Sequence, residues 1–122
     1  MKKKVLDVGQ CAPDHAGIKK LVHSLGAEIR MSSHPDEAIE ILQQFSFDLV
    51  LVNRKIDMDY SDGIELIHKM KRDEKTRDIP VMLITNHANY QKEAMEAGGV
   101  EGFGKDFLYD DETKQKLLKY LA

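Results

Sequence analysis

A small set of polar residues directly follows the apolar segments of this 122-residue chain. The set comprises Gly9 and Gln10, Asn53, Thr85 and Asn86, and Lys105. Together these residues offer a hydroxyl group, an ammonium group and neutral amides, but no carboxylate. A neutral amide is a poor nucleophile, and Mg²⁺ prefers anionic oxygen ligands. The chemistry of these side chains therefore argues against both covalent catalysis and tight binding of a hard cation.

Asn53 ends the segment around which the rest of the chain is organised, Phe47–Asn53. Its core, Leu49–Val52, is continuously aliphatic and short, which is typical of a parallel strand buried on both faces. In open α/β sheets, ligands bind just beyond the carboxyl ends of the strands. Asn53 therefore stands where a functional residue is expected.

Segments with strand character alternate strictly with segments of helical periodicity along the whole chain. The predicted strands are Lys4–Val8, Ala27–Met31, Phe47–Asn53, Val81–Thr85 and Val100–Gly104, and the predicted helices cover 13–25, 35–45, 63–71, 89–97 and 111–121. The alternation predicts an α/β fold with a doubly wound, five-stranded parallel sheet and five helices, a flavodoxin-like three-layer sandwich. We expect one domain over residues 1–122 and no output domain.

Composition restricts the function further. The net charge of −3 argues against a nucleic-acid surface, and no apolar segment approaches the roughly 20 residues of a membrane span. Cys11 is the only cysteine, so an internal disulfide is impossible and a cytoplasmic location is expected. We interpret Cys11 as a small structural residue.

Several segments in order resemble the receiver domains of response regulators, the CheY-like family. They are the apolar segment ending at Asn53, Asp62–Leu66, Ile79–Thr85, Glu96–Gly98 and Phe103–Lys105. The resemblance covers essentially the whole chain and implies the receiver fold. It also implies a phosphoryl switch, with an aspartate acceptor after the third strand, an acidic pair holding Mg²⁺ after the first, and a Thr and a Lys binding the phosphoryl group. Thr85 and Lys105 match the last two positions.

The other family positions differ here. Asn53 occupies the acceptor position, and Gly9 and Gln10 occupy the acidic pair. The aromatic switch position, three residues before the lysine, is Gly102, with Phe103 next to it. We therefore predict a degenerate receiver, or pseudo-receiver, with no phosphorylation at Asn53, no cofactor, and Mg²⁺ binding that is lost or very weak.

Other polar residues have structural interpretations. We expect Asp7 to be a buried structural carboxylate, paired with a lysine, and His15 to be exposed in the first helical turn. Asp57 and Asp59 are interpreted as turn residues rather than as a metal site. For Lys105 we expect a hydrogen bond to the carbonyl of Asn53 or Gln10, or an ion pair with a carboxylate. Such a fixed role predicts a domain held in one state.

The predicted function is that of a stand-alone, non-enzymatic interaction or adaptor module in two-component or phosphorelay-type signalling. Its partner is an unidentified signalling protein, and its oligomeric state is open. The candidate partner surface contains Tyr90, Phe103, Tyr109 and Tyr120. One alternative is a receiver regulated by another anion or small ligand near Thr85 and Lys105. An alternative of another class is a flavodoxin-like cofactor-binding protein or enzyme.

Overall fold

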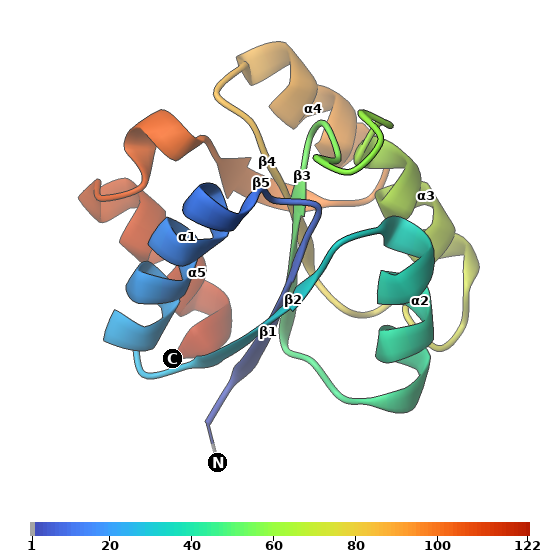
Figure 1. The fold of residues 1–122 in the computed structure, drawn as a ribbon, viewed down its shortest axis with the longest axis horizontal. Helices are drawn as coiled ribbons and strands as arrows, with labels where there is room; N and C mark the ends of the chain where they lie inside the picture. Colours follow the sequence, from blue (N-terminus) through green and yellow to red (C-terminus); the bar gives the residue numbers. More distant parts are fainter. Residues whose placement is uncertain (1) are drawn as a thin grey trace.

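The computed structural model describes residues 2–122 and contains a single five-stranded parallel sheet (Figure 1). The strands are β1 (Lys4–Val8), β2 (Glu28–Ser32), β3 (Leu49–Asn53), β4 (Val81–Ile84) and β5 (Val100–Phe103). Their order in the sheet is β2-β1-β3-β4-β5, which puts β3 in the centre as its uninterrupted aliphatic sequence predicts. The doubly wound α/β fold expected from the sequence is confirmed.

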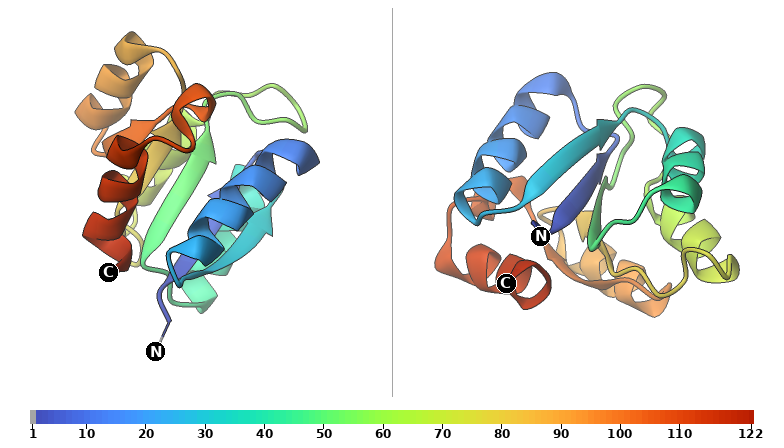
Figure 2. Two further views of the ribbon diagram at one scale, coloured as in Figure 1. Left: turned by 90° about the vertical axis from the view of Figure 1, so that its left-hand side faces the viewer. Right: turned by 90° about the horizontal axis from the view of Figure 1, so that it is seen from below.

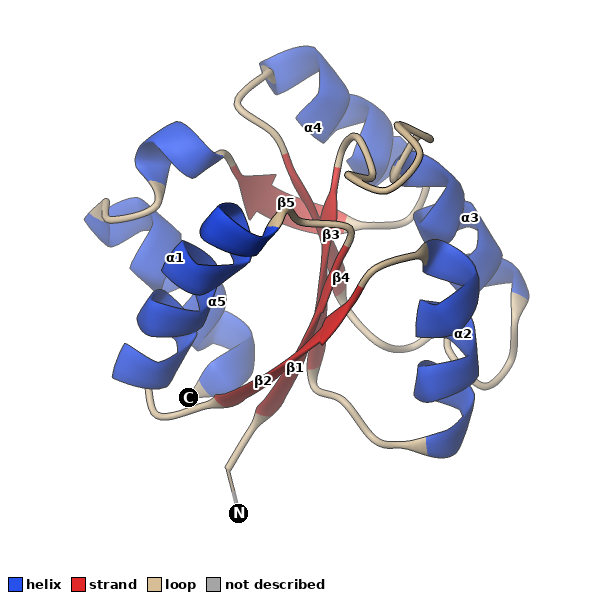
Figure 3. Cartoon of the chain, viewed as in Figure 1, coloured by secondary structure: helices blue, strands red, loops and turns tan. Residues whose placement is uncertain are grey.

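Four α-helices connect successive strands, and a fifth follows β5 (Figure 3). They are α1 (Ala12–Ser24), α2 (Pro35–Gln44), α3 (Ile64–Arg72), α4 (Ala88–Glu96) and α5 (Asp111–Leu121), and a short 3-10 turn, η1 (Lys105–Phe107), precedes α5. Predicted and observed boundaries agree to within about two residues. None of the helices in residues 2–122 combines the length and the apolar character that a transmembrane helix needs.

The helices form two layers, one on each face of the sheet (Figure 2). Helices α1 and α5 cover one face, where Ile18, Leu117 and Leu51 belong to one buried apolar cluster. Helices α2, α3 and α4 cover the other face. Because both faces are buried, the inner strands are almost entirely apolar, with Asp7 on β1 as a buried exception, and most polar residues lie at the carboxyl-terminal edge of the sheet.

Three local features differ from simple sequence expectations. His34 caps α2 and accepts a hydrogen bond from the backbone N–H of Asp36 on Nδ1. Helical periodicity would turn Phe45 inward, but α2 ends at Gln44, and Phe45 adopts extended backbone angles and is 54% exposed. In β5 the register shifts, because Met82 pairs with Val100 and Ile84 with Phe103. Three residues of β5 therefore match two of β4, which is a β-bulge.

Candidate functional site

The side chain of Asn53 is directed into the loop that follows its own strand. Its Nδ2 donates to the carbonyl oxygen of Lys55 at 2.6 Å and, more weakly, to that of Gly9 at 3.4 Å. Asn53 therefore stabilises the β3–α3 loop and links it to the end of β1. The residue predicted to occupy the acceptor position therefore acts as a hydrogen-bond donor to backbone carbonyls.

Gly9 has no room for a side chain. Its backbone is in the left-handed region, with φ of 79°, and a Cβ atom added there would collide with the side chain of Ile56. Ile56 is completely buried, and the N–H of the next residue, Asp57, donates to the carbonyl of Gly9 at 2.9 Å. The β3–α3 loop therefore folds over the end of β1 and places an aliphatic group where a carboxylate would otherwise project.

Asp7 lies on β1 and is completely buried, as expected, but its partner is not a lysine. Its Oδ2 lies 2.7 Å from Nδ1 of His15 on α1. His15 was predicted to be exposed, yet only 14% of its side chain is accessible, because its helix position turns the ring towards the sheet. The other oxygen of Asp7, and both amide atoms of Gln10, are buried without a hydrogen-bond partner within residues 2–122.

Burial is the dominant influence on the Asp7 carboxyl group. It raises the pKa of Asp7 from 3.8 to about 6, although the hydrogen bond and charge of His15 act in the opposite direction. The positive charge of Lys105 also lowers it slightly. Asp7 is therefore a carboxyl group that titrates within two pH units of neutrality, on the strand that leads to Gly9 and Gln10.

Lys105 is engaged by α1. Its Nζ lies 2.6 Å from Oδ2 of Asp14, and this hydrogen bond is the main cause of the lowered pKa of Asp14. Of the predicted roles for Lys105, the ion pair with a carboxylate is thus confirmed. Thr85 is nearly buried, and its Oγ1 accepts from the backbone N–H of His87 at 3.2 Å. Asn86 accepts from the N–H of Asp106.

The acidic residues of the β3–α3 loop have structural roles or face solvent. Asp59 accepts hydrogen bonds from the backbone N–H and hydroxyl of Ser61 at 3.0 and 2.6 Å, and its Oδ2 lies 3.0 Å from Nε2 of His34. These bonds, chiefly those from Ser61, lower the pKa of Asp59 to about 2. Asp57 is exposed, and residues 2–122 contain no group of three acidic, histidine or cysteine side chains placed to hold a metal ion.

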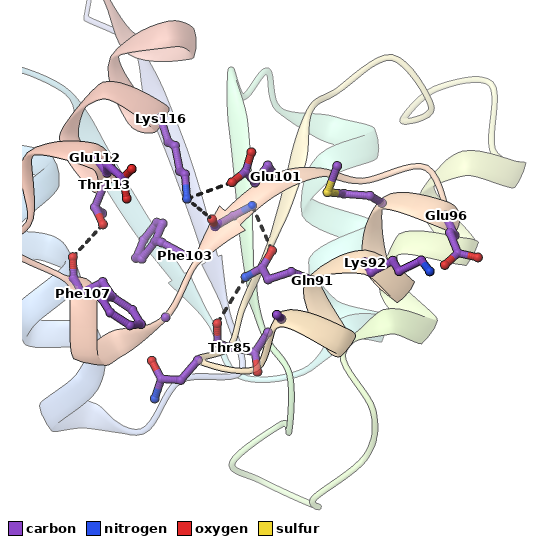
Figure 4. A pocket seen from close by; sticks show the side chains of 15 residues that line it. Thr85, Gln91, Lys92, Glu96, Glu101, Phe103, Phe107, Glu112, Thr113 and Lys116 are labelled. Atoms are coloured by element: carbon purple, nitrogen blue, oxygen red, sulfur yellow. Dashed lines mark hydrogen bonds and ion pairs between the residues drawn. The ribbon is translucent and has the colours of Figure 1, made fainter.

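The bulge in β5 is held by side chains from two helices (Figure 4). Oε1 of Gln91 on α4 accepts from the N–H of Gly102 at 3.0 Å, and its Nε2 donates to the carbonyls of Leu83 and Thr85 at 3.0 and 3.2 Å. Nζ of Lys116 on α5 donates to the carbonyl of Gly102 at 3.1 Å. The backbone at the aromatic switch position is thus fixed by side-chain hydrogen bonds.

A side chain is also excluded at Gly102. A Cβ atom there would collide with the backbone oxygen of Leu83, so neither an aromatic ring nor a methyl group fits without moving β4 or β5. Phe103, the neighbouring candidate, is only 3% exposed and packs in the cluster beneath α1 and α5. Phe103 therefore belongs largely to the core, although it also lines the groove between α4, β5 and α5, and its assignment to the partner surface stays a prediction.

A groove of about 710 Å³ runs between α4, β5 and α5 (Figure 4). Exposed apolar side chains line it, with Met95 and Phe107 each 48% exposed. Its polar lining includes Lys92, Glu96, Glu101, Glu112 and Lys116. Lys116 and Glu101 form an ion pair of 3.1 Å across the groove.

The other predicted surface aromatics are dispersed. Tyr90 on α4 is half-buried beneath the guanidinium group of Arg54, which lies 4.1 Å from the ring centroid. Tyr109 precedes α5 and is 68% exposed, whereas Tyr120, near the end of α5, packs against the core. None of these three rings lines the groove.

Sequence reasoning missed the residues that fill or fix the site: Asp14, His15, Ile56 and Gln91. Ile56 is a lone apolar residue in a polar loop, which is a detectable sign of a buried anchor. Gln91 gives no such sign, because a glutamine on a helix is usually solvated. Its role follows from the bulge beside it.

Comparisons with known proteins agree with this geometry. Residues 14–119 match the response regulator receiver domain family. A response regulator from Chloroflexus aurantiacus has a similar structure, with a TM-score of 0.87, 16% identity and 98% of each chain covered. The chemotaxis response regulator CheY4 of Vibrio cholerae has a TM-score of 0.77 at 17% identity, and the match covers 99% of this chain and 100% of that chain.

Two further known proteins are similar to this chain. The receiver domain of a Pseudomonas aeruginosa sensor histidine kinase, which has magnesium in its active-site cleft, gives a TM-score of 0.76 at 16% identity, with 98% of each chain covered. A probable cyclic di-GMP phosphodiesterase of Vibrio cholerae is 30% identical over an alignment of 104 residues that covers 78% of this chain and only 23% of that protein. The family match and the fold agree, and the chain belongs to the response regulator receiver domain family.

Proposed function

We propose that this receiver domain acts in two-component or phosphorelay-type signalling as a protein–protein interaction module, without phosphorylation at Asn53. The observation that carries the proposal is the ion pair between Lys105 and Asp14 at 2.6 Å. The cation that would bind a phosphoryl group is neutralised by the protein's own carboxylate. The amide of Asn53 is likewise committed to the carbonyl of Lys55.

Magnesium binding is part of the same proposal. The position of the acidic pair offers a glycine and one neutral amide, and Ile56 fills the space above Gly9. The nearest buried carboxylate, Asp7, faces His15 instead. Because Mg²⁺ requires several hard oxygen ligands, these residues do not fit the ion, and we expect weak binding or none.

A fixed partner surface follows from the contacts around the bulge. Gln91 and Lys116 tie α4 and α5 to the same residue of β5, Gly102. A surface held in this way needs no covalent event to form. The groove between α4, β5 and α5 supplies exposed apolar groups, Met95 and Phe107, for a signalling partner.

The competing proposal of an anion or small ligand beside Thr85 and Lys105 has less support. An incoming anion would have to displace Asp14 from Lys105 and the N–H of His87 from Thr85. An anion that must first displace Asp14 from a charge-assisted hydrogen bond binds more weakly than an anion that meets a free ammonium group.

Signalling in the native host tests the proposed function. Replacing Asn53 with alanine should preserve the output, whereas replacing Met95 and Phe107 with aspartate should abolish it without unfolding the domain. Asn89→Asp is the matched control, since it adds a negative charge at an exposed position of α4 outside the groove. Loss of output in Asn53→Ala, with normal thermal stability, would contradict the proposal.

A further inference from the structure

The β2 edge of the sheet is open and has free backbone hydrogen-bonding groups. Among the residues that the structure describes, 2–122, strand β2 pairs only with β1. The N–H of Glu28 donates to Lys3, and the carbonyl of Ser32 accepts from Gly9, so these two residues face β1. Because alternate residues of a strand face opposite edges, the N–H and C=O groups of Ile29 and Met31 face outward. Figure 2 shows β2 at this margin, between α1 and α2.

A groove of about 460 Å³ surrounds the start of this edge and has basic walls. Its charged lining consists of Lys4, Lys19, Arg30 and Glu28, together with His23. Three permanent positive charges against one negative charge contrast with the net charge of −3 for the whole chain. Within residues 2–122, no salt bridge involves the side chain of Lys4, Lys19 or Arg30.

The positive charge lies on both sides of the strand. Lys19 and His23 belong to α1, which covers the face towards which Ile29 points. Arg30 points to the other face, where its guanidinium group lies 5.5 Å from the ring centroid of Phe45. Phe45 is 54% exposed, so the second face also offers apolar surface.

We propose that the open edge of β2 binds an extended, acidic segment of a partner protein as an additional strand. The free groups of Ile29 and Met31 would form the backbone hydrogen bonds of a sixth strand. Side chains of that strand alternate between the two faces of the sheet. Carboxylates on one face would meet Lys19 and His23, and carboxylates on the other would meet Arg30. This surface lies apart from the α4–β5–α5 groove, and the inference does not depend on the proposed function.

Charge favours this occupant over two others. A second copy of the chain paired edge to edge would bring two sets of basic side chains together, which is unfavourable. A small anion would satisfy the basic side chains but would leave the outward N–H and C=O groups of β2 to water. An extended acidic segment satisfies both the charges and the backbone.

Peptide titration followed by amide-resolved NMR tests the inference. The probe is an acetylated and amidated heptapeptide, Glu-Glu-Val-Val-Val-Glu-Glu, which as a strand presents carboxylates on both faces. We expect saturable shifts of the backbone amides of Ile29 and Met31, and weaker binding at higher salt because the contacts are electrostatic. The same peptide with lysine for glutamate should not bind. Replacing its central valine with proline should weaken binding, because proline cannot donate to the ladder.

Variants of the protein separate the backbone from the charges. Ile29→Pro removes an outward N–H and leaves the pairing with β1 intact, and it should weaken binding. Arg30→Glu and Lys19→Glu should each weaken binding about threefold to tenfold, as expected for exposed charge pairs. Lys75→Glu, at an exposed lysine between α3 and β4 that lines neither groove, is the matched control and should bind normally. Circular dichroism verifies that each variant is folded.

Three outcomes would overturn the inference. The first is the absence of shifts at Ile29 and Met31 at millimolar peptide. The second is that the proline peptide, or inorganic polyphosphate, binds as tightly as the acidic peptide without shifting the β2 amides. That result would indicate a small-anion site. The third is a doubling of the mass in light scattering without peptide, lost in Ile29→Pro, which would show that a second copy occupies the edge.

Discussion

The ammonium group of Lys105 and the carboxylate of Asp14 lie 2.6 Å apart, although the two residues are 91 positions apart in the sequence. The pair joins the end of β5 to the first turn of α1. Both side chains are partly exposed, at 31% and 39%, so water screens the pair and its effect on global stability is small. Its importance is that a carboxylate of the chain itself occupies the ammonium group of Lys105.

Removing Asp14 should release that cation. Asp14→Asn is expected to lower the free energy of unfolding by less than about 1 kcal/mol, since the pair is exposed. The freed Lys105 should then bind inorganic phosphate weakly, detected as phosphate-dependent shifts of the Thr85 and Lys105 amides. The exposed residue Asp110 provides the control, Asp110→Asn, which should show no such shifts. Phosphate shifts of equal size in the native protein would contradict the blocking role of Asp14.

Asp7 should make stability depend on pH. The folded protein retains the Asp7 proton up to about pH 6, whereas the unfolded chain releases it near 3.8. Between these values the folded state binds more protons, so the contribution of Asp7 to stability falls as pH rises, by up to about 3 kcal/mol. Both His15 and Lys105 face this carboxyl group and oppose the shift.

The Asp7→Asn variant measures this contribution. As pH rises from about 4 to about 6, the free energy of unfolding of Asp7→Asn should increase relative to that of the native protein. Urea denaturation at several pH values gives this difference directly. Taking the difference removes the opposite trend of Asp14, Asp59 and Asp73, whose lowered pKa values favour folding at higher pH. A constant difference across the window would show that Asp7 does not titrate there.

Gln91 should be essential for the order of β5. Gln91→Leu removes the three side-chain hydrogen bonds to the N–H of Gly102 and to the carbonyls of Leu83 and Thr85. We expect the free energy of unfolding to fall by about 2 kcal/mol. Hydrogen exchange at the Gly102 amide should accelerate more than exchange at the centre of β3. Lys92→Leu, the adjacent exposed position, is the control. Unchanged exchange at Gly102 in the Gln91 variant would show that the bulge is held by other contacts.

Gly102→Ala should destabilise the protein despite its small size. The added methyl group meets the backbone oxygen of Leu83, and a backbone atom cannot move aside without disturbing the β4–β5 pairing. We expect the free energy of unfolding, measured by urea denaturation, to fall by about 1 to 3 kcal/mol. Gly17→Ala on α1 is the control, because its backbone is helical and alanine favours helices. If both variants are equally stable, Gly102 is not sterically constrained.

Much of the fold could be predicted from the sequence because the signals are local. The continuous apolar segments Leu49–Val52 and Val81–Ile84 require burial on both faces, and the helices between the strands show regular apolar spacing. Those two patterns specify a doubly wound sheet. The loop over Gly9 could not be predicted, because it depends on a single aliphatic residue, Ile56, reaching back to β1.

Only part of the site could be predicted, because the sequence shows where strands end but not which distant residues meet there. The positions of Asn53, Thr85 and Lys105 follow from the strand ends, and strand ends are visible in the sequence. Their partners are not visible, because Asp14 belongs to a helix that is distant in sequence from Lys105. His15 was placed wrongly because the neighbouring strand residue, Asp7, gave it a buried polar partner that helical periodicity does not reveal.

The central claim is that the site neither binds Mg²⁺ nor responds to an acyl-phosphate mimic. The direct measurement is amide-resolved NMR of the native domain during titration with Mg²⁺ and then beryllofluoride. The Pseudomonas aeruginosa receiver domain with magnesium in its cleft is the positive control for the metal. A restored variant, with aspartate at positions 9, 10 and 53 and Ile56→Ala to make room, is the control for the mimic.

We predict no shifts at Thr85 and Lys105 in the native domain, and shifts at both residues in the restored variant. Saturable shifts of the native Thr85 and Lys105 amides with Mg²⁺ and beryllofluoride would contradict the account. Such a result would show that the protein retains a phosphoryl-responsive site in spite of Asn53.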